Sequence, residues 1–491
     1  MWFPLTILKG KRLVFYHMEE RKVWISILFV GILFHLSAAA VMPLGLDAHI
    51  HVNYVTDSMS DDEASLDWGT VRTDGANYST PSTVEADDKW AVWHTIIGVW
   101  LSIFGVSLMS LHILSLVISL SCLAVIYLLT NKLWGANNAL ALTAICSIYS
   151  PLVRASGRLY QENIVLMLAT LAVYGLLQTR RKQNSTWWLF ASFISLMAIL
   201  SIKGINPAYS IVLFFPVAYC VVNNLNIKPL KIPVLLAGCL LFSLLMTWFR
   251  TDSITIDTIY FLFRTLFVGG LIYVIMATLF FSSNYQEKSA ESDFLLLLSQ
   301  LVFIAITAYI VMLLEVEKIS LGVSASLTAE QFSYIFRYLT VLVVPLWWSY
   351  LARSKQNEIK LLDNPRRYAM VYAIILILLL NATMLQTTRG MEYVGEEIAD
   401  SVEEGDNILY VSQPYHAMHR LYTLQISVDP NHDRNVTGYW ADHTYNWSHI
   451  ITDSQIDWVI FTDDWQSYLD DDWTEFDTDT DYIVYHRKSS V

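Results

Sequence analysis

Apolar runs of about 20 residues recur along most of this chain and decide what it can fold into. Each is long enough to cross the roughly 30 Å hydrocarbon core of a bilayer as an α-helix. The runs begin at Val23 and stop at about Gln386. Because 55% of the 491 residues are hydrophobic and only 15% are charged, one large soluble globule is excluded. The sequence therefore predicts a multi-pass membrane protein.

The spacing of these runs predicts eleven crossings, and the charges predict their orientation. With the amino terminus in the cytoplasm, lysine and arginine collect in the internal loops, as the positive-inside rule requires. The stretch 91–105 is apolar but short for a span, so we expect a helix lying in the outer interface. The predicted spans are 23–43, 107–130, 136–152, 160–179, 187–202, 207–223, 232–248, 261–281, 294–314, 332–352 and 368–386.

The chain divides into a cytoplasmic amino terminus (1–22), an all-α transmembrane domain (23–386) and an extracytoplasmic soluble domain (387–491). A long external loop, 44–106, interrupts the membrane domain after its first span. The soluble domain combines a predicted helix at 392–404 with short β-rich runs, which is typical of a small α/β domain. Those runs are NILYVS at 407–412, DWVIFT at 457–462 and YIVYH at 482–486.

Most of the negative charge lies in the two predicted external regions. From Thr387 to the end there are 5 basic and 21 acidic residues, and from Leu44 to Trp90 there are 2 and 10. Such acidic surfaces disfavour nucleic-acid binding. An acidic exterior that is poor in lysine also resembles that of proteins from salt-adapted archaea.

Ionisable residues at the predicted outer ends of spans are the first candidates for function, because charge at membrane depth is costly. Several cations at one leaflet suit an anionic headgroup, although each arginine could also simply extend to the interface. Arg154, Arg158 and Glu162 are spaced i,i+4, so on one helix they would share a face and could pair. The candidates are Arg154, Arg158, Glu162, Lys203, Arg250, Arg264 and Arg337.

A second set of candidates follows the first span, in LGLDAHIHVNY at 44–54. Asp47 could take a proton from an attacking hydroxyl, or it could be an ordinary aspartate of an exit loop. His49 and His51, with Asp47 and His94, could bind a divalent metal such as Mn²⁺, Mg²⁺ or Zn²⁺. An H-x-H pair alone does not decide between a metal site and ordinary side chains.

The order of these features resembles the GT-C superfamily of polyprenyl-phosphate-sugar glycosyltransferases, in particular the dolichyl-phosphate-mannose–protein mannosyltransferase and aminoarabinose transferase branch. Asp47 matches the acidic residue that opens the family's first external loop. DDKWAVWHTIIGVWLSIFG at 87–105 resembles the family's next stretch through Lys89, His94 and Phe104-Gly105, although its prolines are absent. Further matches are Arg158 and Glu162 in GRLYQENIVLMLATLAVYGLL, and Arg337 and Tyr338 in FRYLTVLVVPL.

This resemblance implies inverting transfer of mannose or a similar hexose from a polyprenyl or dolichyl phosphate, within the lipid bilayer. The acceptor would be a hydroxyl of a protein, glycan or glycolipid on the outer face. Asp47 would be the general base, and the donor phosphate would be held by Arg158, Lys203, Arg250 and Arg337. Supporting roles fall to Glu162, Lys89, His94 and Tyr338.

Three other readings of the sequence stay open. A secondary transporter would also have many spans and buried charges, but this chain lacks paired Gly/Pro-broken spans in two halves. An oligosaccharyltransferase of the same superfamily should carry a Trp-Trp-Asp motif, which is absent. A membrane scaffold without catalytic activity would tolerate replacement of Asp47 and of the outer arginines.

Overall fold

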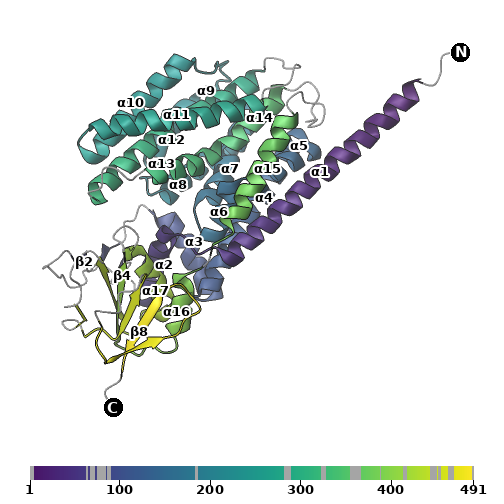
Figure 1. Cartoon of the computed structure of the whole chain (residues 1–491). Helices are drawn as coiled ribbons and strands as arrows, with labels where there is room; N and C mark the ends of the chain where they lie inside the picture. The colour runs from purple at the N-terminus through teal and green to yellow at the C-terminus, as the bar shows by residue number, and fades with distance from the viewer. Residues whose placement is uncertain are drawn as a thin grey trace.

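The computed structural model describes residues 5–61, 65–66, 72–73, 84–85, 90–182, 186–280, 289–321, 328–353, 367–387, 389–412, 417–442, 450–451, 455–462 and 469–488. These residues form a helical bundle with a smaller α/β part at one end (Figure 1). The predicted fold class, an all-α membrane domain with a small α/β domain, is confirmed. On which side of the membrane the α/β part lies stays a prediction.

Every predicted span coincides with helical structure, but the count of eleven stays a prediction. Among the described residues, seven helices are long and apolar enough to cross a membrane, or eight if one bent pair is a single span. The predicted spans 187–202, 207–223 and 368–386 fall on shorter apolar helices.

The helices of the bundle follow one another as α1 (Leu5–Val41), α3 (Ala91–Phe104), α4 (Leu108–Trp134), α5 (Ala136–Ile148), α6 (Ser150–Arg158), α7 (Glu162–Lys182), α8 (Thr186–Ile202), α9 (Tyr209–Val222), α10 (Ile232–Thr251), α11 (Ile256–Phe280), α12 (Ala290–Leu321), α13 (Thr328–Tyr338), the 3-10 turn η2 (Leu339–Leu342), α14 (Val343–Arg353) and α15 (Arg367–Met384).

Both the core and parts of the outer surface of the bundle are apolar. Phe249, Ile256 and Phe267, on α10 and α11, are 79%, 85% and 76% exposed. Water would disfavour such a surface, whereas lipid tails accept it at no cost, so these helices are suited to face the bilayer.

Two breaks shape the end of the bundle where the candidate site lies. Helices α5 and α6 meet at Tyr149 with a bend of 61°, and Pro151 in the first turn of α6 cannot continue the hydrogen bonding of α5. At the other end of α6, Leu159 adopts a left-handed conformation with φ of 50° and ends the helix. Gly157 permits the close packing of α6 on α1, because a Cβ there would lie 2.6 Å from the carbonyl oxygen of Ala38.

The α/β part combines the two acidic regions of the sequence. Its described elements are α2 (Leu46–Asp61), β1 (Ser65–Leu66), β2 (Arg72–Thr73), β3 (Val84–Glu85), α16 (Met391–Ile398), β4 (Asn407–Ser412), α17 (Ala417–Val428), β5 (Thr437–Asp442), β6 (Trp458–Phe461), β7 (Trp473–Phe476) and β8 (Ile483–Arg487). Within the described ranges, six strands form one sheet in the order β2-β5-β4-β6-β8-β7, and β1 pairs with β3. Strand β2 of the external loop pairs in parallel with β5 of the tail.

Helix α2 belongs to the core of this α/β part. Tyr54 is buried with residues of α16, α17 and the sheet, and α2 packs against α17. Asn53 Nδ2 donates to the carbonyl oxygen of Tyr422 at 3.0 Å, and Thr56 Oγ1 lies 2.9 Å from His432 Nε2. The predicted external loop and the predicted soluble domain therefore fold together.

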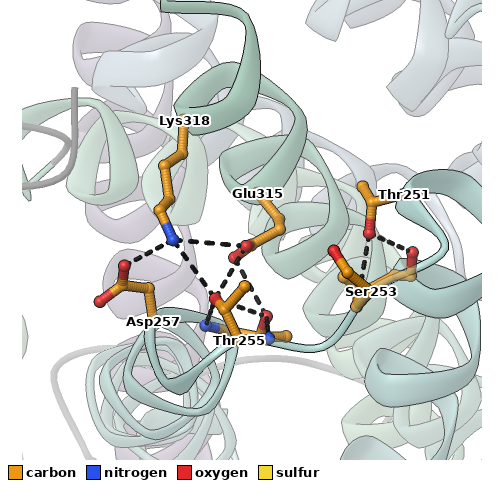
Figure 2. Close-up of polar contacts among 8 residues, drawn as sticks. Thr251, Ser253, Thr255, Asp257, Glu315 and Lys318 are labelled. Carbon is orange, nitrogen blue, oxygen red and sulfur yellow. Dashed lines mark hydrogen bonds and ion pairs between the residues drawn. The ribbon is translucent and has the colours of Figure 1, made fainter. Parts of the chain in front are cut away.

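A buried carboxylate links α11 to α12 at one end of the bundle (Figure 2). Glu315 is fully buried and accepts hydrogen bonds from the Thr255 hydroxyl at 2.8 Å and from the Thr258 hydroxyl at 3.0 Å. Lys318 Nζ lies 3.5 Å from Glu315 and 2.6 Å from Asp257.

We expect Glu315→Gln to lower the free energy of unfolding by about 1–3 kcal/mol, because only one end of an amide accepts hydrogen bonds, so one of the two threonine hydroxyls loses its acceptor. Thermal unfolding of the protein in detergent measures the effect. Asp257→Asn is the matched control: its carboxylate is 39% exposed, so its ion pair contributes only about 0–1 kcal/mol. Equal losses in the two variants would contradict this account.

Candidate active site

Glu162, at the start of α7, is the centre of a charged cluster. Its side chain is 2% exposed, and its Oε1 lies 3.1 Å from Arg337 Nε and 3.4 Å from Lys203 Nζ. Arg337 comes from α13, and Lys203 follows the end of α8. Two cations therefore share one buried carboxylate, which leaves the group positively charged.

Tyrosine rings surround these two cations. The Arg337 guanidinium lies 4.1 Å from the ring centroid of Tyr160, and Lys203 Nζ lies 4.8 Å from that of Tyr338. The rings of Tyr309 and Tyr338 are 5.3 Å apart, and the Tyr309 hydroxyl donates to the carbonyl oxygen of Lys203 at 3.3 Å. These contacts fix the cations while their charge remains available to an anion.

Two further arginines add positive charge on α6. Arg154 interacts electrostatically with Arg158, Arg337 and Glu162, and its guanidinium lies 5.8 Å from the ring centroid of Tyr160. Arg158 Nε is buried and has no hydrogen-bond partner among the described residues. An unpaired buried donor is costly, so a bound anion would stabilise this arrangement.

The prediction that Arg154, Arg158 and Glu162 share one helix face is wrong. The left-handed Leu159 ends α6 directly after Arg158, and α7 begins at Glu162. Glu162 consequently points to Arg337 and Lys203 of other helices instead of forming pairs along one helix.

Asp47 lies beside this cluster, in the first turn of α2. Its carboxylate is exposed and interacts electrostatically with Lys203 and Arg337. A backbone contact just before Asp47 holds this segment next to the cluster: the N–H of Gly45 donates to the carbonyl oxygen of Arg158 at 2.9 Å. Any side chain at Gly45 would collide with Tyr160, because its Cβ would lie 2.1 Å from the ring.

The histidines of α2 face two different groups of residues. His51 Nδ1 lies 3.0 Å from His94 Nε2 of α3, and both rings are close to Trp90. Burial, with smaller contributions from the positive charges of His94 and Lys203, lowers the pKa of His51 to about 3, so His51 is neutral at neutral pH.

His49 is instead 3.6 Å from Glu392 of α16. His49 and His51 therefore do not converge, and they do not fit a shared metal ion. No group of three His, Cys, Asp or Glu side chains within the described ranges is placed to hold one.

The remaining predicted residues lie elsewhere or outside the description. Arg250 is exposed at the end of α10 and makes no hydrogen bond or ion pair with the described residues. Arg264 lies over the ring of Tyr260 in its own helix. Lys89 lies outside the described residues.

Sequence reasoning missed two of the tyrosines of the site and the buried contact between Glu392 and His112. Tyr160 and Tyr309 were not predicted, although Tyr160 stands between the two matched residues Arg158 and Glu162. Glu392 and His112 were also missed, because neither belongs to a motif and their contact joins residues far apart in the chain.

Comparison with known proteins is consistent with this picture. The family model for dolichyl-phosphate-mannose-protein mannosyltransferase matches residues 91–249, which include His94, Arg158, Glu162 and Lys203. No curated protein matches the sequence.

Several solved structures are similar. ArnT from Cupriavidus metallidurans in the apo state is 10% identical over 94% of this chain and 97% of its own, with a TM-score of 0.39. The structure of the same protein bound to undecaprenyl phosphate is also 10% identical, over 95% of this chain and 98% of its own, with a TM-score of 0.39. Arabinofuranosyltransferase AftD from Mycobacteria is 10% identical with a TM-score of 0.44, and the match covers 95% of this chain but 41% of AftD.

The family match covers about a third of the chain and holds most of the charged cluster. It lies in a protein whose helices are long and apolar enough for several membrane crossings. The predicted resemblance to the GT-C superfamily of polyprenyl-phosphate-sugar glycosyltransferases is thereby confirmed over residues 91–249.

Proposed function

We propose that this protein is a membrane glycosyltransferase that moves mannose or a similar hexose from a polyprenyl or dolichyl phosphate to an acceptor hydroxyl. The acceptor is a protein, a glycan or a glycolipid on the non-cytoplasmic side. The observation that carries the proposal is the convergence of Arg337, Lys203 and Glu162 beside the exposed Asp47.

The cations suit the leaving group of such a transfer. As the bond between the anomeric carbon and the phosphate oxygen breaks, negative charge grows on the phosphate. Fixed cations in a largely buried site stabilise that charge more in the transition state than in the ground state. Arg337 and Lys203 are 12% and 11% exposed, and Glu162 neutralises only one of their two charges.

Asp47 suits the other half of the reaction. The acceptor oxygen attacks the anomeric carbon from the face opposite the phosphate, its proton passes to the Asp47 carboxylate, and polyprenyl phosphate leaves. One displacement of this kind inverts the configuration of the sugar. Asp47 makes no hydrogen bond with the described residues, so its oxygens are available to a proton.

The sidedness is part of the proposal. The last turns of α4, α7 and α14 lie at the other end of the bundle from Glu162 and Arg337, and they contain Lys132, Lys182 and Arg353. Basic residues at these helix ends are what the positive-inside rule expects on the cytoplasmic side. Asp47 follows the first span and would therefore meet the outer leaflet.

The test is transfer by the purified protein in lipid. It would be given undecaprenyl or dolichyl phosphates that carry radiolabelled mannose, glucose or aminoarabinose, together with peptide, glycan and lipid acceptors. We expect labelled product from at least one donor and none from nucleotide sugars. No product from any donor, with solute uptake by the same proteoliposomes, would instead identify a transporter.

A further inference from the structure

Glu392 is a carboxylate of the α/β part that the proposed reaction does not use. It lies in the first turn of α16, and its side chain is fully buried. Its Oε1 accepts the backbone N–H of Leu44 at 2.6 Å, and its Oε2 lies 3.3 Å from His112 Nε2. His49 Nε2 and Arg389 Nε are 3.6 Å and 3.9 Å away.

The partners of Glu392 come from separate parts of the fold. Leu44 follows α1, His49 belongs to α2 and His112 to α4. Burial alone would raise the pKa of Glu392, but the hydrogen bond from His112 and the charges of His49 and His112 lower it below its usual value. The ionised carboxylate is thus stabilised where it joins the tail to the bundle.

Glu392 and the Arg158–Tyr160 turn hold the segment 44–49 from two sides. Leu44 and His49 contact Glu392, whereas Gly45 between them donates to the Arg158 carbonyl and packs on Tyr160. Asp47 lies within this short segment. Because its side chain forms no hydrogen bond with the described residues, its direction depends on the backbone that these contacts fix.

We propose that Glu392 is a positioning residue that aims Asp47 at the reacting sugar through its contact with Leu44, a residue 348 positions earlier in the sequence. This inference rests on the proposed function, in which Asp47 takes the acceptor proton. Removal of the contact lets segment 44–49 move, and small misplacement of a catalytic group lowers the rate steeply.

Steady-state kinetics of Glu392→Ala and Glu392→Gln test the inference. We expect Glu392→Ala to lower kcat about 10–100-fold while the donor KM changes less than about threefold, because Arg337 and Lys203 are untouched. Glu392→Gln keeps an acceptor for the Leu44 N–H and should lose less. Glu396→Ala, an exposed glutamate of the same helix, is the matched control and should leave both constants unchanged.

A double-mutant cycle separates positioning from a general loss of folding. If Glu392 acts through Asp47, adding Glu392→Ala to Asp47→Asn costs no further activity. Losses that multiply, or an unchanged kcat in Glu392→Ala, would overturn the inference while leaving the proposed function intact. No transfer by the wild-type protein would overturn both.

A thiol at residue 47 provides a readout that does not depend on transfer. We expect a cysteine introduced by Asp47→Cys to react with a maleimide at a different rate once Glu392→Ala is added, and at the same rate with Glu396→Ala. Identical rates in all three backgrounds would overturn the inference.

Discussion

Asp47→Asn should reduce kcat by about 10²–10⁴-fold, the usual contribution of a general base. Asparagine has nearly the same shape but does not accept the acceptor proton. Asp47 is exposed and makes no hydrogen bond with the described residues, so we expect folding and the donor KM to change little. Transfer of labelled sugar under single-turnover conditions measures the chemical step.

Asp57→Asn is the matched control, because Asp57 lies on the same helix but faces His432 of the tail at 3.4 Å. It should lower stability more than Asp47→Asn and leave kcat nearly unchanged. Undiminished transfer by Asp47→Asn would remove Asp47 from the mechanism.

Arg337→Gln should lower kcat by about 10²–10³-fold, as the loss of one donor to a developing anion does in other enzymes. Arg337→Lys keeps the charge but not the guanidinium geometry, so a smaller loss is expected. Arg337→Gln also leaves the buried Glu162 carboxylate with Lys203 as its remaining cation, so we expect a loss of stability as well.

The triple variant Arg337→Gln with Glu162→Gln and Lys203→Met separates these two effects. It removes all three buried charges of the cluster, so thermal stability should recover toward that of the wild type, while transfer stays low. Recovery of transfer together with stability would mean that Arg337 serves the fold and not the donor phosphate.

The sequence predicted the helices better than the places where they break. Apolar runs identify membrane helices because lipid contact and core packing favour the same side chains. Of the two breaks, the one at Tyr149 is marked only by Pro151, and the one at Leu159 has no signal of this kind. Leu159 in particular has a left-handed conformation that leucine rarely adopts, and it ends the helix between Arg158 and Glu162.

The candidate site was predicted only in part, because the sequence indicates which residues lie at span ends but not how the spans pack. Glu162, Lys203, Arg337 and Tyr338 come together as their positions at span ends suggested. Arg250 shows no contact with them among the described residues, because charge bias assigns a leaflet and not a place within it. Glu392 could not be found this way, since its partners are set by tertiary packing alone.

The pairing of early and late segments has a consequence for biogenesis. Helix α2 and strand β2 leave the ribosome long before α16, α17 and β5, and the sequence separation of the Leu44–Glu392 contact is 348. Until the tail follows, Ile50 and Tyr54 of α2 lack the apolar neighbours that cover them in the finished protein. Closure of such a long loop is slow, and exposed apolar surface invites aggregation meanwhile. We therefore expect the α/β part to fold only after the segment that contains α16, α17 and β5 has been made.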